Sequence, residues 1–274
     1  MKELLLIGES GFLGKELKKE LIKAKNYNVS GTSKNVSSKH YFNLNEKHNL
    51  KLEKYSVVIL LAAITNIQYC EDNPDLCFDT NVTSTIRFID EAVKKGCFVI
   101  FLSSNAVFDG QKKFYSFDDA QSPITKYGES KSIVEKWIAK NHPNDVAILR
   151  LTRVLSENKK AWFDAPFVER WIEEVSSIGI SKVYTNHFIS PISTSEAISA
   201  IKKLIACELG GLFQKGADFE ISYADFAKNA FREAPKIYAN LKRTKQGNRN
   251  FYNSLKTYLP KSSQWKKVSS YFYT

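Results

Sequence analysis

The sequence lacks the residues and runs that mark several common protein classes. Its four cysteines and four histidines show no C-x-x-C pair and no zinc-ligand spacing, so we expect no metal site. No apolar run approaches the roughly 20 residues of a membrane-spanning helix. The apolar run at the N-terminus is too short for the core of a signal peptide. These absences predict a soluble, cytoplasmic protein with reduced thiols.

Acidic residues are absent from the end of the chain. From Lys236 to Thr274 there are nine Lys and Arg residues and no Asp or Glu, so this tail carries nine of the eleven net positive charges. Aromatic residues lie between the cations, a mixture that can bind nucleic acid or an anionic membrane. No nucleic-acid-binding module appears, so we expect no nucleic-acid partner. A weak membrane contact stays open, and packing of the aromatic residues against the rest of the chain is the simpler interpretation.

Apolar runs and amphipathic segments alternate over the first 151 residues. Strands are predicted at 3–8, 27–33, 40–44, 55–63, 97–104 and 145–151. Helices are predicted at 12–24, 71–96 and 125–141. This alternation is typical of a parallel sheet with helices on both faces, and it predicts a Rossmann-type, doubly wound α/β fold.

A glycine-rich turn joins the first predicted strand to the first helix. The stretch GESGFLG places three glycines at a G-x-x-G-x-x-G spacing. Glycines at this point allow a tight turn and let a pyrophosphate approach the helix N-terminus. The residues expected to contact a dinucleotide are Gly8, Ser10, Gly11, Phe12, Leu13 and Gly14, together with Ala62 and Ala63 at the end of the strand predicted at 55–63.

The end of the second predicted strand bears on which dinucleotide binds. An acid there binds the ribose 2′-hydroxyl of NAD, whereas this chain has Thr32, Ser33 and Lys34 and no carboxylate. Two hydroxyls and a cation suit a 2′-phosphate. We therefore expect Ser33 and Lys34 to bind NADPH, with NADH the less favoured cofactor.

Beyond residue 151 the pattern loosens, with helices predicted at 167–179, 193–210 and 221–234. We expect residues 1–151 to form an NADP-binding domain, which residues 183–206 or thereabouts rejoin. The smaller, substrate-binding lobe is expected to consist of 152–182 and 207–274, including the basic aromatic tail.

Tyr127 and Lys131 lie four residues apart in KYGESK, on one face of a predicted helix. Alone, this spacing fits an ordinary helix surface as well as a proton-transfer pair. Ser103 and Ser104, however, end a predicted strand, and in a doubly wound sheet ligands bind beyond the carboxyl ends of the strands. The fold would therefore bring hydroxyl, phenol and ammonium groups toward one site.

Taken in order, these motifs resemble the extended short-chain dehydrogenase/reductase family. The resemblance is carried by GESGFLG, AAITNIQYCEDNPDLCFDTNV, LSSNAVFDG and PITKYGESK, and it covers about residues 1–230. Within the family the sequence is most similar to dTDP-4-dehydrorhamnose reductases and their sugar-nucleotide-binding relatives. This implies an NADPH-dependent reductase of a nucleotide-linked 4-keto sugar, acting in the synthesis of surface polysaccharide precursors.

The resemblance also implies a role for each residue of the site. Tyr127 protonates the sugar carbonyl oxygen while NADPH delivers hydride to the carbon, and Ser104 hydrogen-bonds the same oxygen. Lys131 lowers the pKa of Tyr127 and binds the nicotinamide ribose. Asn81 supports the helix behind the site. The residues expected to contact the nucleotide sugar are Ser104, Asn105, Thr65, Arg153 and Trp162.

Two departures from the family pattern keep alternatives open. Asn105 replaces an Asp that commonly follows the hydroxyl residues. Dehydratases carry an Asp-Glu pair where this chain has Asn105 and Ala106, so we reject dehydration. An epimerase stays open, as does a dinucleotide-binding regulatory or assembly subunit. The intact Tyr127 and Lys131 pair favours an enzyme, and a homodimer is an open alternative for the assembly.

Overall fold

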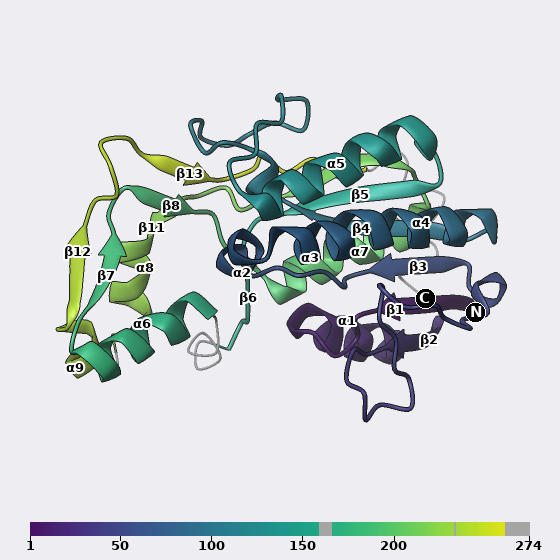
Figure 1. The fold of residues 1–274 in the computed structure, drawn as a ribbon, viewed down its shortest axis with the longest axis horizontal. Helices are drawn as coiled ribbons and strands as arrows, with labels where there is room; N and C mark the ends of the chain where they lie inside the picture. Colours follow the sequence, from purple (N-terminus) through teal and green to yellow (C-terminus); the bar gives the residue numbers. More distant parts are fainter. Residues whose placement is uncertain (159–165, 233, 261–274) are drawn as a thin grey trace.

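The computed structural model describes residues 1–158, 166–232 and 234–260 of the chain. Its centre is a parallel sheet of six strands in the order β10-β5-β4-β3-β1-β2 (Figure 1). The strands are β1 (Lys2–Ile7), β2 (Tyr27–Thr32), β3 (Val57–Leu60), β4 (Phe98–Ser104), β5 (Val146–Leu151) and β10 (Gly211–Lys215). Every residue of β3 and β5 is buried, as expected for strands that are covered on both faces.

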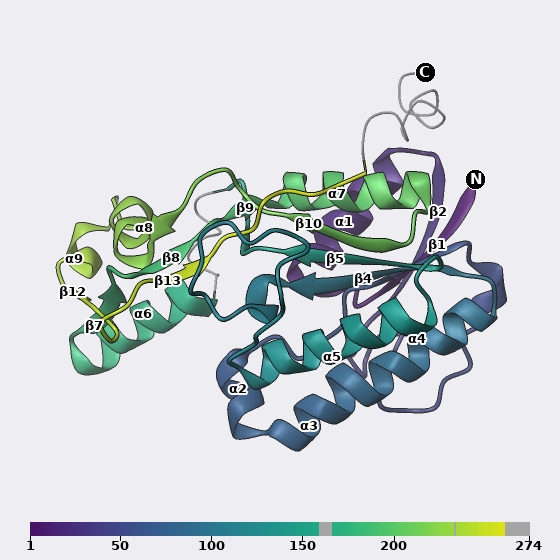
Figure 2. The same cartoon turned by 90° about the horizontal axis from the view of Figure 1, so that it is seen from above.

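Helices cover both faces of this sheet (Figure 2). They are α1 (Phe12–Lys23) and α7 (Thr194–Cys207) on one face, and α4 (Thr85–Lys94) and α5 (Lys126–Asn141) on the other. Leu17 and Leu21 lie on the buried stripe of α1. Phe88 of α4 and Val134 of α5 pack into the opposite core. The predicted doubly wound fold is confirmed.

The helix predicted at 71–96 is interrupted. It forms α2 (Ile67–Asp72), α3 (Pro74–Phe78), a π-helical turn (Asp79–Ser84) and α4. Pro74 has no N–H to donate, so α2 ends before it and α3 begins with it. The strand predicted at 40–44 is wrong, because Tyr41 makes an isolated bridge to Ser33 within a chain of turns.

A second lobe lies beyond the carboxyl ends of the sheet strands (Figure 1). Its elements are α6 (Pro166–Ile178), β7 (Ser181–Tyr184), β8 (His187–Ile189), β11 (Ile221–Ser222), α8 (Tyr223–Ala230), α9 (Pro235–Tyr238), β12 (Leu241–Thr244) and β13 (Phe251–Asn253). Trp171 of α6 and Phe226 of α8 are buried in its own core. This lobe is smaller than the first, as the sequence predicted.

The boundaries predicted for the two lobes need correction. β7 pairs with β12, and β8 pairs with β11 and β13, all within the small lobe, although most residues of β7 and β8 fall in the 183–206 segment that we expected to rejoin the large one. Conversely, β10 forms the edge of the large sheet, although it lies in 207–274. The short β6 (Val154–Leu155) and β9 (Ile192–Ser193) pair where the chain crosses between the lobes. Strand pairing between distant segments decides these boundaries, and local sequence patterns do not record it.

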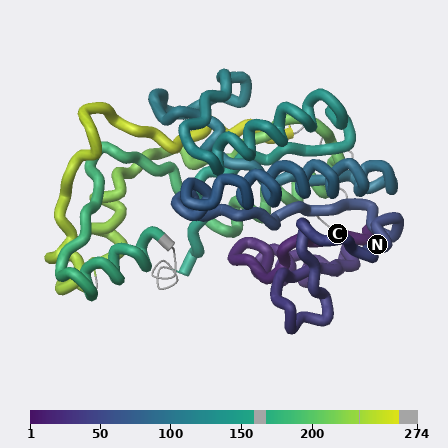
Figure 3. Tube along the Cα trace, viewed as in Figure 1, coloured from purple at the N-terminus to yellow at the C-terminus, as the bar shows by residue number. Residues whose placement is uncertain are grey.

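The segment 251–258 returns from the small lobe to the large sheet (Figure 3). Leu255 bridges to Tyr115, and Tyr258 bridges to β10. The Tyr258 ring stacks on Phe117, with ring centroids 3.9 Å apart. In this part of the tail the aromatic side chains therefore pack against the rest of the chain.

Candidate active site

Close contacts in the glycine turn exclude side chains. Gly8 has a φ of +99°, and a Cβ on it would lie 3.0 Å from the backbone N of Ala62. A Cβ on Gly14 would lie 2.4 Å from the carbonyl oxygen of Gly8. Gly11 precedes α1 without a side-chain cap, and the first turn of α1 holds no acid. The helix N-terminus is therefore open to an anion, and the turn fits the pyrophosphate of a dinucleotide.

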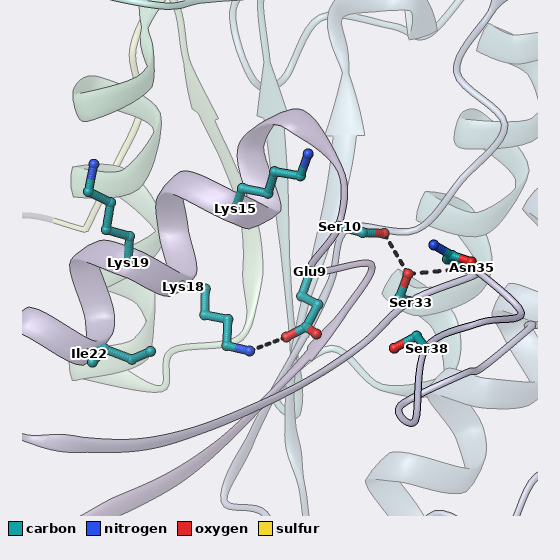
Figure 4. Close-up of a pocket in the computed structure, with 9 residues that line it drawn as sticks. All are labelled: Glu9, Ser10, Lys15, Lys18, Lys19, Ile22, Ser33, Asn35 and Ser38. Carbon is teal, nitrogen blue, oxygen red and sulfur yellow. Dashed lines mark hydrogen bonds and ion pairs between the residues drawn. The ribbon is translucent and has the colours of Figure 1, made fainter.

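A cavity of about 470 Å³ adjoins this turn, between α1 and the end of β2 (Figure 4). Its lining residues are Glu9, Ser10, Lys15, Lys18, Lys19, Ile22, Ser33, Asn35 and Ser38. The Ser33 hydroxyl donates a hydrogen bond to that of Ser10 at 2.9 Å. The structure thus brings together two of the residues predicted to contact the cofactor.

The other predicted cofactor residues differ in position. Lys34 is exposed and does not line the cavity, where lysines of α1 supply the cations instead. Phe12 is also exposed, whereas Leu13 packs against the core. Ala62 lies directly against Gly8. The half-buried Ala63 follows it at the same edge of the sheet.

Tyr127 reaches Ser104 because α5 begins directly against the turn after β4. Thr125 caps α5 by accepting a hydrogen bond from Gly128 N at 3.0 Å. A Cβ on Gly128 would lie 2.1 Å from the carbonyl oxygen of Ala106, so only glycine allows this approach. The Ser104 hydroxyl lies near enough to the Tyr127 phenol to favour its ionised form. Both are therefore held at the carboxyl end of β4.

Lys131 is buried one helical turn further along α5. Its Nζ donates a hydrogen bond to the carbonyl oxygen of Leu102 at 2.9 Å. The same atom lies 4.6 Å from the ring centroid of Phe101 and 5.8 Å from that of Tyr127. Burial lowers the pKa of Lys131 to about 8, and the nearby Glu135 carboxylate opposes this shift.

Burial also dominates the protonation of Tyr127. It raises the pKa of this phenol to about 12, and the nearby Ser104 hydroxyl opposes this shift. The net lowering of this pKa that we expected from Lys131 is not found, because burial of the phenol outweighs it and the Lys131 ammonium group donates to the carbonyl oxygen of Leu102. A phenol with so high a pKa keeps its proton at neutral pH, so the site presents an acid.

A buried ion pair supports this site from behind, and sequence reasoning missed it. Arg150 of β5 is 1% exposed, and its Nη2 lies 2.7 Å from Oε2 of Glu135, which is 2% exposed. Glu135 also accepts hydrogen bonds from Ser103 and Gln121. The only sequence signal was spacing, because Glu135 follows Lys131 by four residues and so shares its helix face. The pair fixes α5 to β4 and β5.

Asn81 holds the loop that follows β3. From the π-helical turn, its side chain accepts from the backbone N of Ile64 at 2.8 Å and donates to the carbonyl oxygen of Ile64 at 2.9 Å. This mimics a strand partner for the loop. The loop begins with Ala62 and Ala63 beside the glycine turn. Asn81 therefore acts on the loop, rather than only on its own helix as we expected.

Comparison with known proteins decides the family. A family model described as "RmlD substrate binding domain" matches residues 1–254. The chain belongs to the RmlD substrate-binding-domain family. The match includes the glycine turn, Tyr127, Lys131 and nearly all of the described small lobe. The family relationship therefore extends beyond residue 230, where the recognised sequence resemblance ended.

Curated relatives of this RmlD-family chain match it in part. It is 28% identical over 183 residues to a dTDP-4-dehydrorhamnose reductase of Sinorhizobium fredii, covering 64% of this chain and 60% of the relative. It is 27% identical over 165 residues to methionine adenosyltransferase 2 subunit beta of Rattus norvegicus, covering 58% and 49%. The chain thus spans less than two thirds of the length of these relatives.

Solved structures share the fold over the whole chain. A dTDP-4-dehydrorhamnose reductase from Bacillus anthracis, solved in complex with NADP, has a TM-score of 0.77 with 20% identity. The match covers 99% of both chains. The RmlD-family chain therefore has the Rossmann-type fold of these reductases, small lobe included.

Asn105 and Arg153, two of the residues predicted to contact substrate, form hydrogen bonds with residues of the small lobe. Asn105 donates from Nδ2 to Oδ1 of Asn253 in β13 at 2.7 Å, so the residue that replaces the family Asp joins the lobes. Arg153 donates to the Tyr223 hydroxyl at 3.1 Å, and its buried Nε has no hydrogen-bond partner. Thr65 is exposed. Trp162 lies outside the described residues.

Two further predictions concern metals and membranes. Among the residues that the structure describes, no group of three or more His, Cys, Asp or Glu side chains could hold a metal ion. No helix in that part of the chain is both long and apolar enough to cross a bilayer. All four cysteines are free thiols.

Proposed function

We propose that the chain is an NADPH-dependent reductase of a 4-keto sugar linked to a nucleoside diphosphate, as in surface polysaccharide precursor synthesis. The observation that carries the proposal is the convergence of Ser104, Tyr127 and Lys131 at the carboxyl end of β4, beside an open glycine turn. Both the Sinorhizobium relative and the Bacillus structure are named dTDP-4-dehydrorhamnose reductases. Retention of the complete set of reacting groups supports the same class of reaction here.

Ser104, Tyr127 and Lys131 would each have a separate role in the reduction. A bound NADPH supplies the hydride that reduces the sugar carbonyl carbon. The Ser104 hydroxyl orients the carbonyl oxygen, and Tyr127 donates its proton to that oxygen as negative charge develops there. The buried Lys131 cation stabilises the phenolate that remains. Lys131 is buried, whereas the half-buried Tyr127 faces the site.

The cofactor would be held by the glycine turn and the cavity beside it. Gly11 and the N-terminus of α1 suit the pyrophosphate, and the hydroxyls of Ser10 and Ser33 with the lysines of α1 suit the 2′-phosphate. The Bacillus neighbour was solved with NADP. These features support NADPH over NADH.

Arg153 is the strongest candidate for the substrate diphosphate. It is half-buried, its Cζ lies 4.5 Å from the ring centroid of Phe167, and it forms no ion pair among the described residues. An arginine held between the lobes by aromatic rings, with Tyr223 alongside, has its planar charge available for a phosphate group. Thr65 and Asn105 would contact the sugar from the large lobe.

The second candidate is a dinucleotide-binding subunit without turnover. It is favoured by the relatives named methionine adenosyltransferase 2 subunit beta, and by Asn105, whose amide is already bonded to Asn253. An epimerase is a third alternative, because it would use the same Tyr127 and Lys131.

Assembly and membrane contact complete the proposal. A homodimer is proposed on family grounds. The described cations of the tail are exposed, although Arg243 forms an ion pair with Asp225 at 3.0 Å. We propose at most weak contact with anionic membranes. Sedimentation with phosphatidylserine vesicles tests this contact. Salt at about 0.5 M screens exposed charges from one another, so binding that persists at that concentration would contradict an electrostatic contact.

Turnover with a panel of 4-keto sugars on thymidine, uridine, guanosine and cytidine diphosphate tests the enzyme. We expect NADPH consumption with at least one sugar and a loss of about a hundredfold or more in Tyr127→Phe. Tyr238→Phe, in α9 of the small lobe, is the matched control and should retain activity. Dinucleotide binding with no turnover of any sugar would instead support the regulatory subunit.

A further inference from the structure

The glycine turn places a carboxylate where the sequence showed none. Glu9 follows Gly8, and its backbone N donates to the carbonyl oxygen of Thr32 at 2.9 Å. A Cβ on Gly31 of β2 would lie 2.0 Å from Oε2 of Glu9. The Glu9 side chain therefore lies directly over β2, in space that a glycine leaves free. Only 15% of this side chain is exposed.

A lysine of α1 neutralises this carboxylate. The Nζ of Lys18 lies 2.6 Å from Oε2 of Glu9 (Figure 4). Lys15 and Lys19 line the same cavity without contacting Glu9, and Lys19 pairs loosely with Glu16 at 3.9 Å. The cavity wall therefore carries one carboxylate and three lysines, and the carboxylate lies against Gly31 of β2.

The position of Glu9 matters because it bears on the 2′ group of the adenosine ribose. A carboxylate at the end of β2 accepts a hydrogen bond from a free 2′-hydroxyl and repels a 2′-phosphate. In this chain the carboxylate belongs to Glu9 of the glycine turn rather than to a residue of β2. Its pairing with Lys18 removes its net charge, and Lys15 and Lys19 then leave the cavity positive.

We propose that the Glu9–Lys18 pair sets the preference of this chain between NADPH and NADH. With Lys18 in place, the carboxylate is neutralised and the cavity accepts a 2′-phosphate. Without Lys18, Glu9 repels the phosphate and accepts the 2′-hydroxyl of NADH. The inference rests on the proposed dinucleotide binding and adds to it the residues that select the cofactor.

Calorimetric titration of the full chain with NADPH and with NADH tests the pair at one low, fixed ionic strength. The variants are Lys18→Met, Glu9→Gln and the double variant. We expect Lys18→Met to weaken NADPH binding by about tenfold or more and to leave NADH binding within about threefold. In the Glu9→Gln background, Lys18→Met should weaken NADPH binding by less than about threefold, because no carboxylate is left to be neutralised.

Two controls keep the test specific. Lys23→Met removes a lysine of α1 that pairs with Glu20 outside the cavity, and it should change neither affinity. Lys18→Arg should restore the NADPH preference if charge is what matters. Circular dichroism of each variant checks that the fold is kept.

Each outcome decides between the two proposals. Equal losses for NADPH and NADH in Lys18→Met, or equal costs of that change with and without Glu9, would overturn the inference and leave dinucleotide binding intact. Failure of the unmodified chain to bind either nucleotide would overturn the proposed function and the inference together.

Discussion

Lys131 is the single residue on which the pH dependence of the site is expected to rest. Its pKa is lowered to about 8 by burial. The groups that face it are Tyr127 and Glu135 on its own helix, Cys70 and Cys77 from α2 and α3, and the Leu102 carbonyl oxygen of β4. With a pKa of about 8, Lys131 is mostly cationic at neutral pH and loses its charge as pH rises through this value.

We therefore expect the turnover number to fall above about pH 8, while the high pKa of Tyr127 keeps its proton available across the range. The measurement is a pH profile of NADPH consumption at saturating keto sugar. Lys131→Arg stays charged at every accessible pH, so its alkaline fall should move upward even if its rate is lower. An identical alkaline limb in both proteins would assign the titration to another group.

Gly11 and Gly14 of the turn are expected to serve different functions, cofactor binding and packing, and alanine substitutions distinguish the two. A Cβ on Gly14 would lie 2.4 Å from the carbonyl oxygen of Gly8, which is too close. A Cβ on Gly11 would lie 3.5 Å from the same oxygen, which is an ordinary contact. Gly11 also has a φ of −70°, which any residue adopts. We expect Gly14→Ala to lower the thermal midpoint by several degrees, roughly what 1–3 kcal/mol of overpacking produces.

Gly11→Ala should leave the thermal midpoint nearly unchanged and weaken NADPH binding, because its added methyl group lies where the pyrophosphate approaches the helix. Thermal unfolding and calorimetric titration of both variants provide the comparison. If Gly11→Ala bound NADPH as tightly as the unmodified chain, the pyrophosphate would not lie at this turn.

At the scale of elements, α5 carries the site and is fixed by charge as well as by packing. Arg150→Met would leave the Glu135 carboxylate buried and unpaired, so we expect the free energy of unfolding to fall by about 3–5 kcal/mol. The double variant Glu135→Gln/Arg150→Met leaves no buried charge and should lose less than Arg150→Met alone. Urea unfolding measures both.

The exposed pair of Arg170 and Glu174 supplies the control for this cycle. Its atoms are 3.6 Å apart and the arginine side chain is 60% exposed, so Arg170→Met should cost less than about 1 kcal/mol. If the loss of unfolding free energy in the double variant equalled the sum of the losses in Glu135→Gln and Arg150→Met, Glu135 and Arg150 would act independently, contrary to the structure.

Elements formed by local patterns were predictable from the sequence. Leu17 and Leu21 recur at helical spacing in α1, and the apolar runs of β3 and β5 are buried on both faces as expected. The π-helical turn was not predictable, because its geometry is linked to Asn81, whose partner Ile64 lies 17 residues away. Hydrogen bonds of this kind depend on the tertiary fold and leave no local pattern.

At the scale of the whole molecule, long-range pairing decides what the sequence left open. β10 joins the large sheet beside β5, although residues 152–210 lie between them in the sequence, and the segment 251–258 crosses back from the small lobe to the large sheet. The same limit applies to the site. Ser104, Tyr127 and Lys131 were found by motif, but the Glu135–Arg150 pair and the Glu9 carboxylate required the fold.

Hydride transfer from NADPH to a nucleotide-linked 4-keto sugar is tested most directly with a deuterium label. NADPH deuterated at the transferable position is incubated with the chain and each nucleotide-linked 4-keto sugar, and the sugar is analysed by mass spectrometry. We expect a reduced sugar that carries one deuterium, and no deuterated sugar with Tyr127→Phe. Recovery of unreduced sugar in every case, or of an epimerised sugar without deuterium, would contradict it.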